Sequence, residues 1–172
     1  FIGPGDVAID AGANIGTHSL AFAQLVGNTG KVFSFEPQPE IHAILRQNID
    51  ANQLHHVYSY NLGLGPKKGN LLLERLDYGK SHNFGAVWLF EKAGEVDKER
   101  CREVKIESLD DLGLPSCNLI KIDVEGMELQ VVQGAHRTIA KSRPFIYAEC
   151  NSVHFGGPLI QHFMALDYSA FL

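Results

Sequence analysis

The sequence predicts an α/β fold, a doubly wound and mostly parallel sheet with helices on both faces. Three observations predict it. Short β-rich runs alternate with segments of helical apolar spacing through the first sixty residues. A glycine-containing turn joins the first run to the first helical segment. The regular strands end at polar, mostly acidic residues, as expected where the carboxyl ends of parallel strands form one functional edge.

In the first sixty residues the pattern is βαβαβ, which favours parallel strands joined by right-handed crossovers. The apolar positions of the second helical segment fall at helical spacing, and Gly27 and Asn52 are suitable residues to end the two helices. The expected elements are a strand at 7–9, a helix at 15–26, a strand at 32–35, a helix at about 41–51 and a strand at 56–61.

From residue 63 to about 106, glycines and charges alternate with β-rich runs, which predicts a β-rich excursion from the sheet. Ser108 stands three residues before Asp111, a capping-box spacing for one short helical turn. Two further strands are expected at 118–124 and 144–149, separated by one helix that carries Leu129 and Ile139. Pro158 is expected at the first position of a last helix, and residues 167–172 could begin another strand. We expect a single domain spanning residues 1–172.

Composition limits the partners. The 172 residues carry a net charge of −5, so no global field attracts nucleic acid or an anionic membrane. Three cysteines without CxxC spacing indicate reduced thiols and a cytoplasmic protein. No apolar stretch is long enough to cross a bilayer. The eight histidines are scattered, which argues against a histidine metal site. Phe1 lies close to the first buried strand, so we expect the chain to be a fragment.

The turn after the first strand begins with a carboxylate, Asp10, followed by Gly12, Asn14 and Gly16. A pyrophosphate would be repelled by that carboxylate, whereas a ligand with cationic groups would be attracted. Glu36 ends the next strand about twenty residues after Gly16, a position suited to accept both hydroxyls of a ribose. A ligand that combines an ammonium, a sulfonium, a ribose and an adenine is S-adenosylmethionine. The acids and glycines therefore predict this cofactor, with glycines allowing close approach of the backbone.

Four segments together resemble a known family: "DAGANIGTHS", "FSFEPQP", "SLDDL" and "IKIDVEGMELQVVQGA", in this order and at these spacings. The chain resembles the FkbM-type methyltransferases from about residue 5 to residue 168. They are a branch of the Rossmann-like class I S-adenosylmethionine-dependent methyltransferases, and the resemblance implies that fold. It also implies O-methylation of a hydroxyl on a sugar or another small metabolite.

By the same resemblance, Asn61 lies near the adenine and Asp123 near the methyl group. The residues implied to line the cofactor are Asp10, Gly12, Asn14, Gly16 and Glu36. We expect the chain to depart from the full class I fold at its ends, with a sixth strand that barely starts, no seventh strand and no segment that covers the substrate. The expected fold is thus truncated at its C-terminal strands.

Methyl transfer to an aliphatic hydroxyl benefits from aligned reactants and from a base that takes the proton. Lys121, Asp123 and Glu125 alternate along an expected strand, so their side chains would share one side and form a charged cluster. We predict that Asp123, with Lys121 and Glu125, orients or deprotonates the acceptor. The alternative is a buried ion-pair network that only fixes the strand end, with Glu125 favouring a helix N-terminus.

Other candidates are weaker. Glu149, Asn151 and His154 follow the fifth strand and could face an acceptor or assist deprotonation. A divalent metal held by Asp123, Glu125 and Glu149 is conceivable, but nothing in their spacing requires it, and we predict none. Trp88 and Phe90 could belong to the core or wall a substrate pocket.

Two alternatives to a methyltransferase remain open at this point. An NAD(P)-linked oxidoreductase or epimerase would need a GxGxxG turn, whereas the turn here has GxxxG after an acid. A methyltransferase-like binding module without turnover would keep the same turn and acids. The expected partner is a small hydroxyl-bearing acceptor; neither nucleic acid nor a membrane is expected, and the oligomeric state is open.

Overall fold

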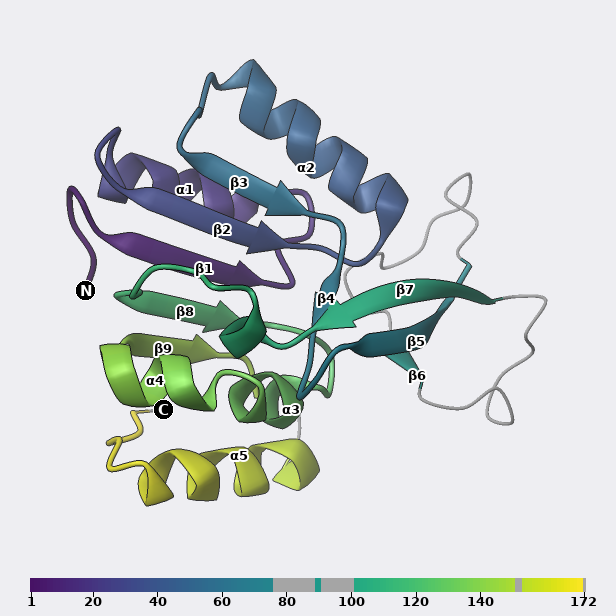
Figure 1. Ribbon diagram of the computed structural model, residues 1–172, viewed down its shortest axis with the longest axis vertical. Helices are drawn as coiled ribbons and strands as arrows, with labels where there is room; N and C mark the ends of the chain where they lie inside the picture. The colour runs from purple at the N-terminus through teal and green to yellow at the C-terminus, as the bar shows by residue number, and fades with distance from the viewer. Residues whose placement is uncertain (76–88, 91–100, 151–152, 172) are drawn as a thin grey trace.

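The computed structural model describes residues 1–75, 89–90, 101–150 and 153–171, with side chains described except at 89–90 and 153–155. Its main sheet has five parallel strands in the order β3-β2-β1-β8-β9 (Figure 1). The strands are β1 (Val7–Ala11), β2 (Lys31–Phe35), β3 (Val57–Tyr60), β8 (Leu119–Ile122) and β9 (Phe145–Ala148).

Helices cover both faces of this sheet. The helices are α1 (Thr17–Val26), α2 (Pro39–Ala51), α3 (Glu128–Gln133), α4 (His136–Ser142) and α5 (Val153–Ala165). One apolar core joins Ala8 of β1 to Ala23 and Leu45 of α1 and α2. The other joins Ile9 of β1 to Val131 of α3 and to residues of α4 and α5. Successive residues of β1 thus enter opposite cores, as the alternation of a strand requires. The doubly wound, mostly parallel α/β fold predicted from sequence is confirmed.

A second sheet branches from the carboxyl end of β3. It has the strand order β4-β7-β5-β6, in which β4 and β7 are parallel while β5 is antiparallel to both β6 and β7. Its strands are β4 (Gly63–Leu64), β5 (Gly69–Glu74), β6 (Leu89–Phe90) and β7 (Cys101–Glu107). Arg102 of β7 pairs with Glu40 of α2 at 2.7 Å, which ties this sheet to the main body. A 3-10 turn, Leu109–Asp111, then leads back to β8.

The single helix expected after β8 is wrong, because the chain forms α3 and α4 with a break at Gly134. The carbonyl of Gly134 accepts the amide of Asp110, so it is drawn out of the helical pattern. The Asp110 carboxylate then accepts the backbone N–H groups of Arg137 and Thr138, which begins a new helix. A side chain at position 134 would also collide with the Gly65 carbonyl, 2.0 Å from the ideal Cβ.

The expected start of the last helix is also wrong. Pro158 lies inside α5, which begins at Val153 rather than at the proline. The residue before the proline is Gly157, and without a Cβ it relieves the clash that normally keeps such a residue out of the helical region. Residues 168–171 form no strand; the Tyr168 hydroxyl instead donates to the Pro144 carbonyl.

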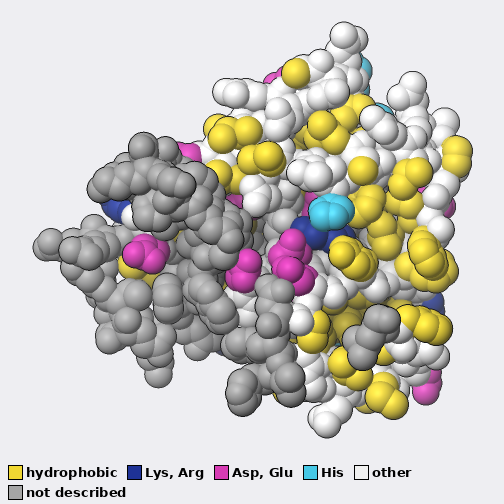
Figure 2. All heavy atoms as spheres, turned by 180° about the vertical axis from the view of Figure 1, so that it is seen from behind, with side chains coloured by type: hydrophobic (Ala, Val, Ile, Leu, Met, Phe, Trp, Pro, Cys, Tyr) yellow, Lys and Arg dark blue, Asp and Glu magenta, His cyan; other side chains and the backbone are white. Residues whose placement is uncertain are grey.

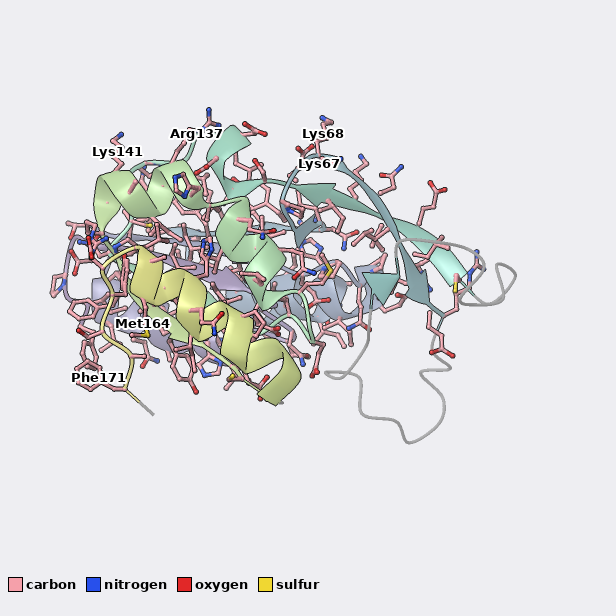
Figure 3. The ribbon with its side chains drawn as sticks, turned by 90° about the horizontal axis from the view of Figure 1, so that it is seen from below. Lys67, Lys68, Arg137, Lys141, Met164 and Phe171 are labelled. Atoms are coloured by element: carbon pink, nitrogen blue, oxygen red, sulfur yellow. The ribbon has the colours of Figure 1, made fainter. Side chains whose placement is uncertain are left out.

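The surface on the side of α4 and α5 is mixed in character. Figure 3 labels Met164 on α5 and Phe171 beyond it, both largely exposed. Two of the labelled basic residues are paired: Lys68 lies 3.0 Å from Glu107, and Arg137 lies 2.8 Å from Asp111. No described helix is long and apolar enough to cross a membrane.

Candidate active site

An open cleft of about 190 Å³ lies at the carboxyl ends of the main-sheet strands. It is lined by Gly12, Asn14, Glu36, Gln38, Asp123, Glu125 and Glu149. A smaller, more apolar depression adjoins it and is lined in part by Phe35, Leu64, Leu73, Val124 and Met127. The cleft therefore lies where ligands bind in open parallel sheets, with a polar acidic part and an apolar part.

The turn after β1 is built around two glycines that no other residue could replace without strain. Gly12 has φ +76°, and a Cβ there would lie 1.8 Å from the Asp123 carbonyl oxygen. Gly16 has φ +101°, and its Cβ would meet Leu45 at 2.7 Å. The space beside both glycines is thus filled by the chain itself. We had expected the glycines to admit a ligand; their immediate effect is to admit the loop after β8 and helix α2.

Glu36 is held in place by two backbone donors. Its Oε2 accepts the N–H of Asn14 at 2.9 Å, and its Oε1 accepts the N–H of Gln38 at 2.8 Å. Only 4% of the residue is exposed. Burial raises the pKa of Glu36 to about 7, although the two N–H groups and the charge of Lys121 pull it down. A carboxylate fixed in this way keeps lone pairs that can accept further hydrogen bonds at the cleft.

Beneath the cleft lies a buried charge network. The Lys121 ammonium lies 3.3 Å from Asp10 Oδ1 and 3.3 Å from Asp123 Oδ2, and it donates to the Gly12 carbonyl at 2.8 Å. Asp10 has no exposed surface and also accepts the Ser19 hydroxyl at 2.6 Å. Asp10 therefore supports the turn from below through Lys121, and in this structure it does not line the cleft.

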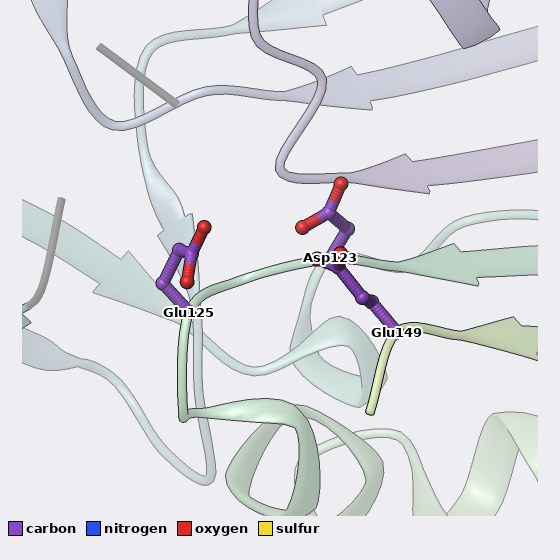
Figure 4. Close-up of side chains that lie close together, drawn as sticks. All are labelled: Asp123, Glu125 and Glu149. Carbon is purple, nitrogen blue, oxygen red and sulfur yellow. The ribbon is translucent and has the colours of Figure 1, made fainter. Parts of the chain in front are cut away.

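Three carboxylates gather at the opposite side of the cleft. Asp123, Glu125 and Glu149 each place an oxygen within 4.8 Å of the other two (Figure 4). Burial pushes the pKa of Asp123 up, but a side-chain hydrogen bond with Glu149 and the Lys121 ammonium outweigh it, so the pKa is lowered. Asp123 thus remains ionised, with about a third of its side chain exposed.

The expected alternation of Lys121, Asp123 and Glu125 along one strand is wrong, because β8 ends at Ile122. Glu125 adopts a left-handed backbone conformation, φ +47°, in the turn that follows. Lys121 and Asp123 still meet, but Glu125 reaches the cluster through this turn. The cluster is therefore made by the turn, and its third partner, Glu149, comes from the end of β9.

The remaining predicted cofactor residue, Asn61, lies beside the cleft and not among its lining residues. Its amide donates to the carbonyls of Glu36 and Pro37 at 2.9 and 3.1 Å, which fixes the loop that carries Glu36. A contact between Asn61 and an adenine remains a prediction. Trp88 and Asn151 lie outside the described residues, as do the side chains of Phe90 and His154.

Sequence reasoning missed three residues near the site. Gln38 lines the cleft, Ser19 anchors Asp10, and His18 acts electrostatically on Asp123. Ser19 and His18 lie in the first turn of α1, directly after the glycine turn. Their position one turn into the helix was the available signal, because a helix that follows such a turn begins at the carboxyl edge of the sheet.

Comparisons with known proteins find similar sequences along most of the chain. A family model described as the methyltransferase FkbM domain matches residues 10–169. The chain is 28% identical over 163 residues to the 2-O-methyltransferase NoeI of Sinorhizobium fredii, covering 85% of this chain and 63% of that protein. It is 29% identical over 151 residues to the hexuronic acid methyltransferase AglP of Haloferax volcanii, covering 86% and 56%. The chain thus spans about three fifths of the length of these relatives.

Solved structures share the fold at low identity. The methyltransferase FkbM of Methylobacillus flagellatus superimposes with a TM-score of 0.67 at 18% identity, covering 93% of this chain and 37% of that one. The precorrin-6y C5,15-methyltransferase of Geobacter metallireducens gives a TM-score of 0.59 at 14% identity, covering 98% and 66%. These likenesses concern the fold alone.

Proposed function

The chain belongs to the FkbM methyltransferase family, and from this premise we propose that it is the core of an S-adenosylmethionine-dependent O-methyltransferase. The acceptor we propose is a hydroxyl of a sugar or another small molecule. The name of one relative, a 2-O-methyltransferase, supports a hydroxyl acceptor, and the name of the other, a hexuronic acid methyltransferase, supports only that the acceptor is of the sugar class. We also propose a cytoplasmic location, supported by the three free thiols.

The observation that carries the proposal is the state of Glu36. Both of its oxygens are oriented by backbone N–H groups, it is nearly fully buried, and it lies at the cleft floor. Such a carboxylate is preorganised to accept two hydroxyl groups, as a ribose presents them. The neighbouring acids Asp123, Glu125 and Glu149 would repel a diphosphate and attract a cationic ligand. The residues present therefore fit an adenosine-bearing sulfonium donor.

In this proposal Glu36 holds the ribose, and the depression that includes Phe35, Leu64 and Met127 takes the adenine. When bound, S-adenosylmethionine supplies an electrophilic methyl group. Asn14 and Gly12 shape the floor on which the donor lies, and Lys121 fixes the Gly12 carbonyl. Asp123, ionised and tied to Lys121, orients the acceptor hydroxyl through a hydrogen bond. Alignment of this kind supplies much of the rate when the leaving group is already good.

A thermal-shift and calorimetry experiment tests the cofactor. S-adenosylhomocysteine at one hundred times its Kd should stabilise the protein by about 2.7 kcal/mol, while NAD and inorganic diphosphate should have no effect. Glu36→Gln should weaken the binding of S-adenosylhomocysteine at least tenfold. Glu103→Gln, an exposed acid on β7, serves as the matched control and should leave that binding unchanged.

Two outcomes would contradict the proposal. Stabilisation by NAD without any effect of S-adenosylhomocysteine would support the oxidoreductase alternative. Binding of S-adenosylhomocysteine without transfer of labelled methyl groups to any hydroxyl compound of a broad panel would support a binding module.

A further inference from the structure

An exposed imidazole, that of His18, lies beside the acidic side of the cleft and is not used by the mechanism above. It projects from the first turn of α1. Its ring lies 5.9 Å from Phe22, one helical turn further on, and 6.3 Å from Tyr147 of β9, between ring centroids. No hydrogen bond joins this imidazole to another described residue. The His18 side chain is thus exposed and lies near two aromatic rings.

The strand order separates the two sides of the site. Glu36 follows β2, Asp123 follows β8 and Tyr147 lies on β9, in a sheet ordered β2-β1-β8-β9. Neighbouring strands lie about 4.8 Å apart, so Glu36 and Tyr147 flank Asp123 on opposite sides. Figure 2 shows this face, where acidic, basic and histidine side chains adjoin exposed hydrophobic ones. If the donor's nucleoside lies toward Glu36, the acceptor would reach Asp123 from the side of His18 and Tyr147.

Tyr147 is a second exposed ring on this side of the site. It is 60% exposed, although it stands on a strand of the main sheet. Its backbone is in register with Lys121 of β8, which is in register with Asp10 of β1, so these side chains share one face of the sheet. An exposed aromatic face next to carboxylates and an imidazole can hold an amphipathic ring, with its C–H groups on the aromatic ring and its hydroxyls on the polar groups.

Asp123 is a poor proton acceptor, because Lys121 and Glu149 hold it in the ionised form. A hydroxyl that is being methylated still has to lose its proton, and the ideal base is one whose basicity matches the working pH. Imidazole is the side chain best suited to this task near neutrality. The His18 ring lies 6.3 Å from that of Tyr147, whose backbone is in register with Lys121, the partner of Asp123, so His18 places an imidazole on this side of Asp123.

We propose that His18 and Tyr147, together with Asp123, form the acceptor subsite, which takes an uncharged sugar ring and in which His18 receives the hydroxyl proton. This inference rests on the proposed function. The acceptor oxygen forms a bond to the methyl carbon as the carbon–sulfur bond breaks, the bonding pair stays with sulfur, and the O–H proton passes to an imidazole nitrogen of His18. The products are a methyl ether, a neutral thioether and a protonated imidazole.

The preference for an uncharged ring follows from the charges around the subsite. Ionised Asp123 lies beside Glu125, and Glu149 shares a hydrogen bond with Asp123; Lys121, the cation that the described residues place beside them, is already shared between Asp10 and Asp123. A sugar carboxylate would enter this negative field unpaired, which is unfavourable at short range. A neutral glycoside carries no such penalty.

NMR on the S-adenosylhomocysteine complex tests the subsite without an activity assay. The probes are neutral methyl glycopyranosides of gluco, galacto and manno configuration, each beside its uronic acid counterpart. The neutral glycosides should shift the His18 and Tyr147 ring signals, and the uronic acids should bind at least tenfold more weakly. His18→Ala should abolish the shift of the Tyr147 signal, and Tyr147→Ala should abolish the shift of the His18 signal. The control variants His55→Ala and Tyr58→Ala, which remove exposed rings at other places of the fold, should leave both shifts unchanged.

Kinetics with the glycoside that shifts these signals most separate the two roles. His18→Gln should lower kcat by about 10²-fold or more and leave KM within threefold, because glutamine cannot take the proton. Tyr147→Ala should raise KM about tenfold, and Tyr147→Phe should restore it. All variants should bind S-adenosylhomocysteine as the parent does.

The inference is overturned if no neutral glycoside moves the His18 and Tyr147 signals, if uronic acids bind better than neutral glycosides, or if His18→Gln keeps the parental kcat. Each of these results leaves the binding of S-adenosylhomocysteine unaffected. Loss of that binding in the parent protein would instead contradict the proposed function itself.

Discussion

Replacing Lys121 by methionine should destabilise the protein strongly, because it removes the one described cation from a buried charge network. Lys121 is 2% exposed and Asp10 is 0% exposed, and their charged atoms lie 3.3 Å apart. Breaking a buried pair by removing one partner costs about 3–5 kcal/mol, since the other charge stays buried and uncompensated. Asp10 keeps the Ser19 hydroxyl as a donor, so we expect the lower end, about 3 kcal/mol.

A double-mutant cycle separates this charge effect from lost packing. Asp10→Asn alone should cost about 1 kcal/mol, because asparagine can still accept from Ser19 and Lys121 keeps Asp123 and the Gly12 carbonyl. The double variant, free of the buried carboxylate, should cost only about 2 kcal/mol. The expected coupling is thus about 2 kcal/mol, within the usual range for contacting residues.

Urea unfolding followed by far-ultraviolet circular dichroism measures these values. Additive costs, or a loss below 1 kcal/mol for Lys121→Met alone, would refute the reasoning that the network is held by charge. If Lys121→Met does not fold at all, recovery of a cooperative transition in the double variant is the informative result. Asp123→Asn is the control, because Asp123 is partly exposed and its loss should cost less than 1 kcal/mol.

Three further predictions concern stability. The pKa of Glu36 is raised from 4.5 to about 7, so the folded state binds more protons than the unfolded state between these pH values. The free energy of unfolding should therefore fall by at most about 3 kcal/mol from pH 4.5 to 7. In urea titrations at several pH values, Glu36→Gln should reduce this pH dependence. Gly12→Ala should prevent folding or cost several kcal/mol, because its Cβ would meet the Asp123 carbonyl. Gly27→Ala has open space but φ +61° and ψ −177°, a region used almost only by glycine, and should cost about 1–3 kcal/mol by calorimetry. Asp110→Ala should lower the free energy of unfolding by about 1–2 kcal/mol at pH 7, because α4 loses its cap. Since the pKa of Asp110 is lowered in the folded state, the difference in stability between parent and variant should shrink as the pH falls below the usual carboxyl range. A cost that does not change with pH would contradict the capping role.

Local patterns were sufficient to predict the main sheet. The helical spacing of Ile41, Leu45 and Ile49 and the stop at Asn52 correspond to α2, which ends at Ala51. Gly27 ends α1 as expected. These elements follow from the alternation of buried and exposed positions, which a single sequence displays. The parallel direction of the strands followed from the βαβ pattern, whereas their order came from the structure.

The mispredicted features have two different origins, a contact between distant segments and a local exception at a proline. The break between α3 and α4 arises because Asp110, more than twenty residues earlier, takes up the carbonyl of Gly134 and caps the next helix. That contact is not visible in local periodicity. The early start of α5 is local, because Gly157 lets the helix continue into Pro158 where most residues before a proline would not.

The sequence predicted which residues lie near the candidate site, but not how deep each lies or which of them line the cleft. Glu36, Asp123 and Glu125 line the cleft together with the glycine turn, but Asp10 lies beneath it and Asn61 beside it. Depth below a surface depends on the side chains above, here Lys121, which a pattern of acids at strand ends does not reveal. His18 was missed because its partner Tyr147 is more than a hundred residues away.

The backbone of Asp123 packs directly against Gly12, so the loop after β8 and the turn after β1, which are far apart in the chain, are held in close contact. The glycine turn is proposed to bind the donor, and Asp123 is proposed to orient the acceptor. Because these two segments are packed together, they cannot move independently, and donor and acceptor would be held in a fixed relative position. Relatives that methylate a different acceptor would then be expected to differ in residues of β9 and of the second sheet, and to keep the contact between Asp123 and Gly12.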